Sequence, residues 1–305
     1  MKTTIAGLLT LSLLVFSCEK VKNPIPKSGS SEINWSLYPE GDSAHYVANY
    51  WPEFDNNTNT ERNVLIENFT GHRCFFCVPV DEAIHEMLDN NPNRVFEAAI
   101  HSGPQGLTLF QETSVIEGFL EEYFNDDALT IGTFFGNNSP NFQALPRVSV
   151  SRKMYNNEIT YSPNAMSGLT TEALDDELQV NIQIQHNYFA ATRGLFTHVE
   201  VDKLDQNLTD DLSLIMYVVE DSMISPQSGP NGIIPNYVHK NIFRGSVIDP
   251  LGHVLEQADL EANGKYYYFS SYQLPLDLAP ENLHLLVFVR NTATQEILQV
   301  IKHDL

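Results

Sequence analysis

Cysteine is scarce in this sequence, which has three in 305 residues, and no second CxxC pair is present to complete a structural zinc site. Basic residues are also scarce, since 17 lysines and arginines face 39 aspartates and glutamates and leave a formal net charge of −22. A chain this acidic repels nucleic acid and anionic lipid, so we expect no nucleic-acid partner. Beyond residue 18 no apolar run is long enough to span a bilayer.

The N-terminus predicts an exported lipoprotein. A short positive segment precedes an apolar run of twelve residues, Ile5–Phe16, which is too short to span a bilayer as a stable helix. The run ends at Ser17 and Cys18, an arrangement that resembles a bacterial lipoprotein signal, in which the cysteine carries the lipid. We expect residues 1–17 to be the signal peptide and residues 18–57 to be a tether and N-terminal segment. The lipid would then anchor the chain to a membrane, whereas the alternative is an ordinary secretory signal.

Export also bears on the two remaining cysteines, Cys74 and Cys77, in the stretch ENFTGHRCFFCVPV. Outside the cytoplasm paired cysteines are usually oxidised, so we expect a disulfide between them. Haem attachment is excluded because Val78, and not a histidine, follows the second cysteine. We expect neither a cofactor nor a metal.

The first half of the chain alternates predicted strands and helices. Apolar runs predict buried strands, and apolar residues at helical spacing predict helices. The strands are expected at 62–69, 94–101 and 145–152, and the helices at 76–88 and 113–124. This order indicates an α/β layer with parallel strands.

A CxxC pair between a buried strand and a helix, followed by a proline that opens a later strand, resembles the thioredoxin fold, here over residues 58–168. The resemblance implies that Cys74 is the nucleophile at a helix N-terminus, where the helix dipole stabilises a thiolate, and that Cys77 is the resolving thiol. It also implies that Pro146 is a cis-proline facing the disulfide. The usual tryptophan is replaced by Arg73, and the intervening pair is Phe-Phe. Catalytic and static disulfides therefore both stay open.

Four polar residues near the pair carry further expectations. Asn68 occupies the position where cytoplasmic thioredoxins carry a buried acid, and Glu67, one residue earlier, is expected to point away. His101 ends the second predicted strand, so it is expected either to approach Cys74 or to be an ordinary strand-end residue. His85 is expected on the solvated flank of the helix.

The second half, residues 169–305, alternates apolar and polar residues with period two and has no strong helix signal. Strands are expected at 178–189, 192–204, 212–221, 265–274, 284–291 and 296–303. This pattern predicts an all-β antiparallel sandwich of the immunoglobulin-like kind. Residues 164–178 supply either a last helix or a linker between the two domains.

One long connection, residues 222–250, interrupts these strands and predicts a binding loop or an irregular surface loop. It contains His239, Lys240 and Arg244, which are local cations on an acidic protein. These residues would dock a partner or the first domain, or would belong to ordinary loop packing.

The lipoprotein start, VLIENFTGHRCFFC, LPRVSV and YVHKNIFRG together resemble the Omp28-related outer-membrane lipoproteins of the Bacteroidota. The resemblance implies a thioredoxin-like domain followed by a β-sandwich, anchored by lipid on the periplasmic or the cell-surface face of the outer membrane. It also implies adhesion or receptor roles.

Two functions follow as hypotheses. The first is a lipid-anchored protein with a binding or adhesion role towards envelope or host proteins, whose CxxC disulfide is structural or regulatory. The alternative is an extracytoplasmic thiol–disulfide oxidoreductase that uses Cys74, Cys77 and Pro146.

Overall fold

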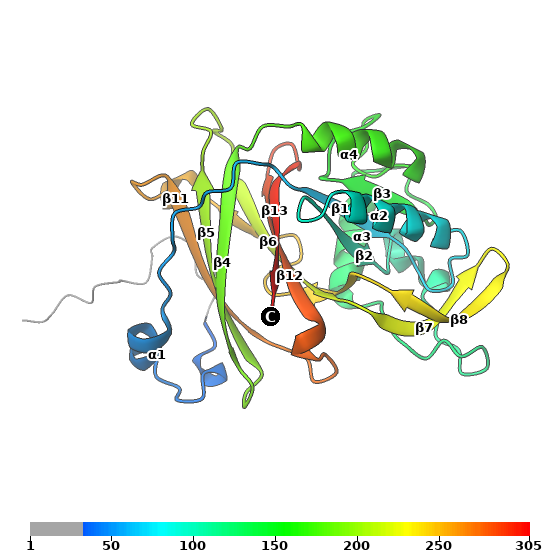
Figure 1. The fold of residues 1–305 in the computed structure, drawn as a ribbon, viewed down its shortest axis with the longest axis horizontal. Helices are drawn as coiled ribbons and strands as arrows, with labels where there is room; N and C mark the ends of the chain where they lie inside the picture. The colour runs from blue at the N-terminus through cyan, green and yellow to red at the C-terminus, as the bar shows by residue number, and fades with distance from the viewer. Residues whose placement is uncertain (1–32) are drawn as a thin grey trace, which may run out of the picture.

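The computed structural model describes residues 33–305 (Figure 1). The expected signal peptide, the expected lipidation site Cys18 and the first part of the expected tether lie outside the described residues. Within the described part of the chain, no helix combines the length and the hydropathy needed to cross a membrane.

An eight-stranded sheet runs through both halves of the described chain. Its strands are β1 (Val64–Phe69), β2 (Val95–Ile100), β3 (Arg147–Val150), β6 (Leu212–Glu220), β9 (Ile242–Ser246), β10 (His253–Leu255), β12 (Leu283–Asn291) and β13 (Ile297–Asp304). The order is β13–β12–β6–β9–β2–β1–β3, with β10 paired to β6. The parallel pairing of Ala99 with Ile242 joins β2 to β9 and so connects the two halves. The fold is thus mixed α/β with a mostly β second half, and the domain boundary at residue 168 stays a prediction.

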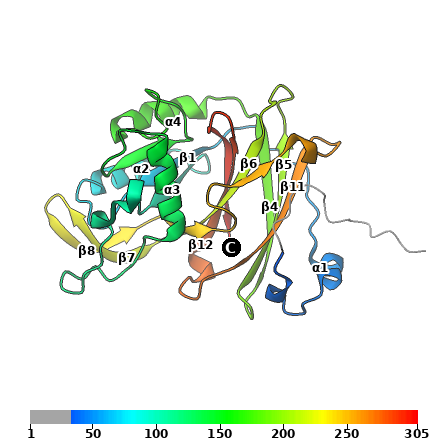
Figure 2. The ribbon, with the colours of Figure 1, turned by 180° about the vertical axis from the view of Figure 1, so that it is seen from behind.

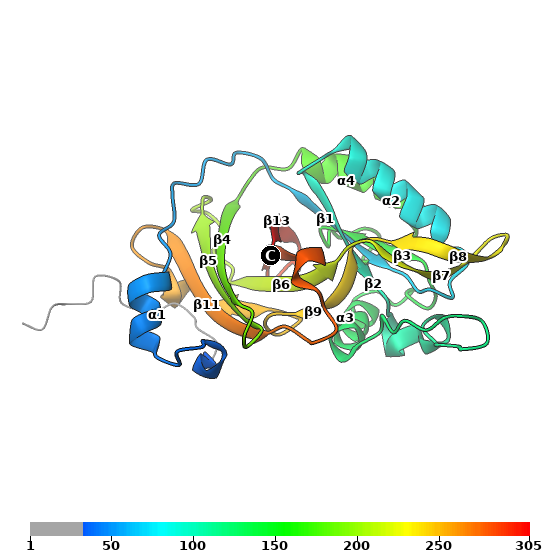
Figure 3. The ribbon, with the colours of Figure 1, turned by 60° about the horizontal axis from the view of Figure 1, so that its bottom comes forward.

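Helices cover both faces of the β1–β3 end of this sheet (Figure 3). They are α2 (Val78–Asn90), α3 (Asp126–Asn137) and α4 (Met166–Leu174). Side chains of β1 alternate, so Val64 and Ile66 pack with α2 and α4, whereas Leu65 and Phe69 pack with α3. This double burial explains the continuous apolar run of β1.

Two expectations for the first half are wrong. β3 runs antiparallel to β1, because the chain enters β3 at the end of β1 where the CxxC turn begins. Among β1, β2 and β3, only β1 and β2 pair in parallel. Residues 113–124 form turns with a bridge between Ser114 and Phe119, and the helix begins later, at α3. Its N-cap is Asn125, whose side chain accepts a hydrogen bond from Ala128 N, and two aspartates follow in the first turn.

The strands expected in the second half are confirmed. A three-stranded sheet, β4 (Val180–Phe189), β5 (Gly194–Lys203) and β11 (Lys265–Gln273), has the order β11–β5–β4. It packs on one face of β6 and β12, and the opposite face of these two strands packs towards α3 (Figure 2). β6 therefore contributes alternate side chains to two apolar cores, Leu214 and Met216 to one and Ile215 and Tyr217 to the other.

The connection 222–250 is not a loop but a hairpin followed by β9. The hairpin strands are β7 (Met223–Gly229) and β8 (Gly232–His239), and Gly229 pairs with Gly232 across a two-residue turn. Glycine at 232 has φ +116°, a conformation that other residues rarely adopt. The expectation of a binding or irregular loop here missed this turn chemistry.

The remaining helical segments are short. Helix α1 (Ser43–Tyr50) packs on the outer face of the three-stranded sheet, with Tyr46 in a buried aromatic cluster beside Phe196 and Phe269. The 3-10 segments are Trp35–Leu37, Pro104–Phe110, Pro163–Ala165, Gln257–Asp259 and Pro280–Asn282. The α1 end and the β7–β8 hairpin lie at opposite ends of the molecule (Figure 1).

Candidate functional site around the disulfide

The disulfide lies at the junction of β1 and α2. Cys74 and Cys77 are joined by an S–S bond of 2.06 Å, and their Cα atoms are 5.4 Å apart. The carbonyl of Gly71 accepts a hydrogen bond from Cys74 N, and the carbonyl of Cys74 accepts one from Cys77 N. Cys77 is the N-cap of α2, and Pro79 stands in the first turn, where a proline removes no helical hydrogen bond. The expected disulfide is therefore present at the expected helix start.

Pro146 stands directly before β3. Its peptide bond with Leu145 is cis, as the sequence resemblance implies. The antiparallel register of β1 and β3, continued by one residue, brings Pro146 opposite Thr70, at the end of β1 where the CxxC turn departs. Leu145 packs in the same buried cluster as the two cysteines. The role of Pro146 in any redox step stays a prediction.

The strand β7 covers the disulfide. The two cysteines are only 1% and 0% exposed. The side-chain amide of Gln227 donates to the carbonyls of Gly71 and Cys74, at 3.2 and 3.0 Å. The backbone N–H of Ser228 donates to the carbonyl of His72 at 2.8 Å. Part of β7 thus lies against the CxxC turn and helps to separate the sulfurs from solvent.

The segment after β2 forms a second part of this cover. A Cβ at Gly71 would lie 2.7 Å from the carbonyl oxygen of Phe110, so the close approach of the two backbones requires glycine. Arg73 Nη2 lies 2.6 Å from Glu117 Oε2, and its guanidinium lies 4.9 Å from the centre of the Phe119 ring. Arg73 therefore connects this segment to the CxxC turn.

Two buried carboxyl groups lie near the base of α2. Asn68 is buried, and its side-chain amide donates to Asp81 Oδ1 and to Glu97 Oε1, both at 2.9 Å. Burial, together with the charge of Glu97, raises the pKa of Asp81 to about 7. Asn68 thus bonds to acids that neighbouring elements supply. The sequence could not reveal them because Glu97 lies on another strand.

Three further residues complete this polar cluster. Tyr237 OH donates to Asp81 Oδ2 at 3.1 Å, and Asn241 Nδ2 donates to Glu97 Oε2 at 3.0 Å. His85 Nε2 lies 3.4 Å from the same Glu97 oxygen. Burial alone would lower the pKa of His85, but the hydrogen bond and the charge of Glu97 raise it. The expectation that His85 is solvated is therefore wrong, because α2 packs this flank against β2.

His101 is fully buried between aromatic rings. Its ring centre lies 4.7 Å from that of Tyr123 and 6.0 Å from that of His239, and neither of its ring nitrogens has a hydrogen-bond partner. Burial, with the nearby His239, holds the pKa of His101 well below its usual value. A cavity of about 10 Å³ reaches from His101 to Asp81 and Glu97, which is room for one water molecule. Within residues 33–305 no group of three or more His, Cys, Asp or Glu side chains is placed to hold a metal ion.

Glu67 does not point away, as expected, but forms a fully buried ion pair. Arg152 Nε and Nη2 donate to its two carboxylate oxygens at 2.9 and 2.6 Å, and Tyr217 OH donates to one of them at 3.3 Å. Both charged side chains are 0% exposed. Because helices and a second core cover both faces of the sheet here, no side chain of β1 can reach solvent. The pair joins β1 to the residues that follow β3, and Tyr217 links both to β6.

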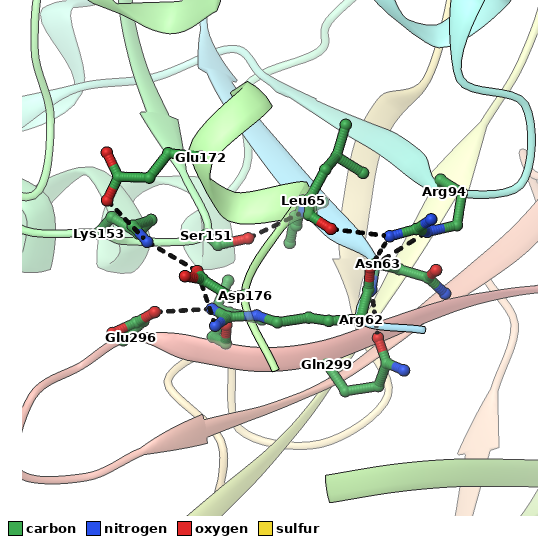
Figure 4. Close-up of polar contacts among 12 residues, drawn as sticks. Arg62, Asn63, Leu65, Arg94, Ser151, Lys153, Glu172, Asp176, Glu296 and Gln299 are labelled. Carbon is green, nitrogen blue, oxygen red and sulfur yellow. Dashed lines mark hydrogen bonds and ion pairs between the residues drawn. The ribbon is translucent and has the colours of Figure 1, made fainter. Parts of the chain in front are cut away.

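A second polar network, absent from the sequence expectations, lies at the other end of β1 (Figure 4). Arg62 is paired with Asp176 at 3.0 Å and with Glu296 at 2.7 Å. Lys153 reaches the same Asp176 at 2.7 Å and Glu172 at 3.2 Å. These ion pairs hold the start of β1, the end of α4 and the start of β13 together.

Comparisons with known proteins give a family and a fold. The sequence model of the family described as "Outer membrane protein Omp28" matches residues 137–305. Among solved structures, HBP35 of Porphyromonas gingivalis is 18% identical, with a TM-score of 0.62, and the match covers 82% of this chain and 77% of that one. A domain of the outer membrane lipoprotein Omp28 from the same organism is also 18% identical, over 42% of this chain and 88% of that one, with a TM-score of 0.28. The comparison with curated proteins finds no match.

Proposed function

The chain belongs to the Omp28 family of outer membrane proteins, and from this premise we propose that it is a binding protein of the cell envelope whose Cys74–Cys77 disulfide is structural. In this proposal Cys18 carries the lipid that anchors the chain to the outer membrane. The partners are envelope or host proteins, and the disulfide stabilises the surface that meets them.

The proposed scaffold is a thioredoxin-like unit over residues 58–168 and an immunoglobulin-like sandwich over residues 169–305. The first is supported by the order β1, CxxC turn, α2, β2 and by the cis bond before Pro146. The second is supported by the three-stranded sheet that packs on β6 and β12.

One observation carries the choice of a binding role over a redox role: the cysteines are buried beneath β7. Thiol–disulfide exchange requires an incoming thiolate to reach a sulfur atom. Here Gln227 and Ser228 bond to the CxxC turn, and both cysteines are essentially without solvent contact. Buried cysteines of this kind are inert unless the cover opens.

The second candidate, an oxidoreductase, is favoured by Asp81. This residue follows Cys77 by one helical turn, and its carboxyl group has a pKa of about 7. A carboxyl with a pKa near neutrality is suited to exchange a proton with a resolving thiol. The candidate requires the β7–β8 hairpin to open before each reaction.

The test is a trapping experiment with Cys77→Ala in the full-length chain, because this variant leaves Cys74 as a free attacking thiol. The matched control is Cys74→Ala/Cys77→Ala, which cannot form a mixed disulfide through this site. A structural disulfide predicts that the single variant traps no more envelope proteins than the control. Abundant mixed disulfides in the single variant alone would establish the oxidoreductase instead.

A further inference from the structure

Exposed apolar side chains gather at the end of the molecule that carries the disulfide cover. Nine of the fifteen large apolar side chains that are exposed in residues 33–305 come from three segments at this end. These nine, here called the apolar tip, are Phe75, Phe76, Leu109, Val115, Ile116, Leu120, Ile224, Ile233 and Val238. Val115 and Ile116 are 86% and 98% exposed. Contiguous exposed apolar surface of this kind marks interaction sites.

The three segments meet around the CxxC turn. Backbone bonds run from Arg73 N to the carbonyl of Phe110 and from Ser228 N to the carbonyl of His72. The segment after β2 also contacts β7 directly, because the hydroxyls of Tyr123 and Ser225 are hydrogen-bonded at 2.8 Å. The β7–β8 hairpin and this segment project side by side from the same end (Figures 1 and 3).

The surroundings of the apolar tip are acidic. Glu112, Glu117, Glu121 and Glu122 are exposed and alternate along the chain with its apolar residues. Among them Glu117 is paired with Arg73, so three carboxylates on this segment have no ion-pair partner in the described chain. Their charge favours a cationic ligand and opposes both anionic lipid and a second copy of the same acidic tip.

The edge of the hairpin favours an extended ligand. Within the described residues β8 has a strand on one side only, β7, so its other edge is free to pair. Pro235 within β8 is consistent with an edge position, since proline is tolerated in sheets mainly at edges. Free edges of this kind bind peptides by strand addition, in which main-chain bonds provide affinity and side chains provide specificity.

We propose that the apolar tip binds an extended peptide segment of a partner protein in which basic and apolar residues alternate. The apolar side chains of the peptide pack on the exposed residues of the hairpin and of the neighbouring segment, and its basic side chains approach the glutamates. This inference rests on the proposed binding function and names the chemistry of the partner.

The probe is a synthetic peptide of about ten residues, the length of a long strand, with lysine alternating with valine or isoleucine. A second peptide with glutamate in place of lysine is its control. Binding to the full-length chain is measured by fluorescence anisotropy with Val115→Ser/Ile116→Ser and with Leu276→Ser. Leu276 is 89% exposed and lies outside the apolar tip, so its variant removes exposed apolar surface elsewhere on the molecule.

The lysine peptide should bind at least tenfold more tightly than the glutamate peptide. The double variant should weaken that binding at least tenfold, and Leu276→Ser should leave it unchanged. Because the replaced side chains are exposed, both variants are expected to keep the parent circular dichroism and melting temperature.

Equal binding of the two peptides, or lysine-peptide binding that the double variant does not weaken, would overturn the proposal. Sedimentation with neutral phosphatidylcholine vesicles that is lost in the double variant would instead assign the apolar tip to a lipid surface. A redox role found with Cys77→Ala would overturn the proposed function but would leave this result standing, so the two failures are distinguishable.

Discussion

Replacing Gln227 with alanine should open the disulfide to reductants. The Gln227 side chain donates to two carbonyls of the CxxC turn, those of Gly71 and Cys74, at 3.2 and 3.0 Å. A buried hydrogen bond contributes about 1 kcal/mol net, so the loss of these two bonds weakens closure of the cover by about 2 kcal/mol. When opening is fast relative to attack, that change raises the open population, and with it the rate of reduction, roughly 30-fold.

The assay follows reduction of the Cys74–Cys77 disulfide by dithiothreitol, with the new thiols alkylated and counted by mass. Ser228→Ala is the control, because it keeps the backbone N–H that bonds to His72. Gln227→Ala should be reduced much faster than both the parent and this control. If the three proteins are reduced at equal rates, β7 does not limit access to the sulfurs and the reasoning fails.

Three further predictions concern stability, measured by urea unfolding. Glu67→Gln should lower the free energy of unfolding by about 3–5 kcal/mol because it leaves the buried Arg152 unpaired, whereas Glu67→Leu/Arg152→Met should recover most of that loss. Equal losses in the two variants would contradict this prediction. Since the folded pKa of Asp81 is about 7, above its ordinary value of 3.8, the stability that Asp81 contributes is lost as pH rises from 4 to 7. Asp81→Asn should remove this decline of the free energy of unfolding with pH, and an equal decline in the variant and the parent would refute the prediction. Burial, with the neighbouring His186, lowers the pKa of His303 to about 4, so the stability that His303 contributes is lost as pH falls from 6.5 to 4. Over that range the free energy of unfolding of His303→Gln should fall less than that of the parent, and an equal fall would count against this prediction.

The features that the sequence predicted well are local ones. The CxxC turn between a β-rich run and a helix needs only neighbouring residues. The cis bond before Pro146 was implied by the resemblance to thioredoxin. The period-two strands of the second half are also local signals, and all of those expected are present. In each case the pattern that forms the element lies within the element.

The helix expected at 113–124 failed because helical spacing of apolar residues was taken to mean burial. Val115, Ile116 and Leu120 are in fact exposed, and the stronger local signal was the N-cap at Asn125 followed by two aspartates. These three exposed side chains belong to the apolar tip.

The features that the sequence could not predict depend on residues far apart in the chain. Glu67 is buried because Arg152 and Tyr217, 85 and 150 positions away, supply its partners. The disulfide is covered because Gln227 reaches Cys74 across 153 positions. No periodicity or motif encodes such pairings, so the accessibility of the sulfurs, on which the function depends, could be learned only from the fold.

The most direct test of the structural role of the disulfide is the reduction potential of the Cys74–Cys77 couple in the full-length chain, measured by equilibration with a thiol–disulfide buffer. A structural bridge protected by β7 predicts a potential below about −300 mV. A value between about −270 and −120 mV, the range of thioredoxin-type oxidoreductases, would contradict the account.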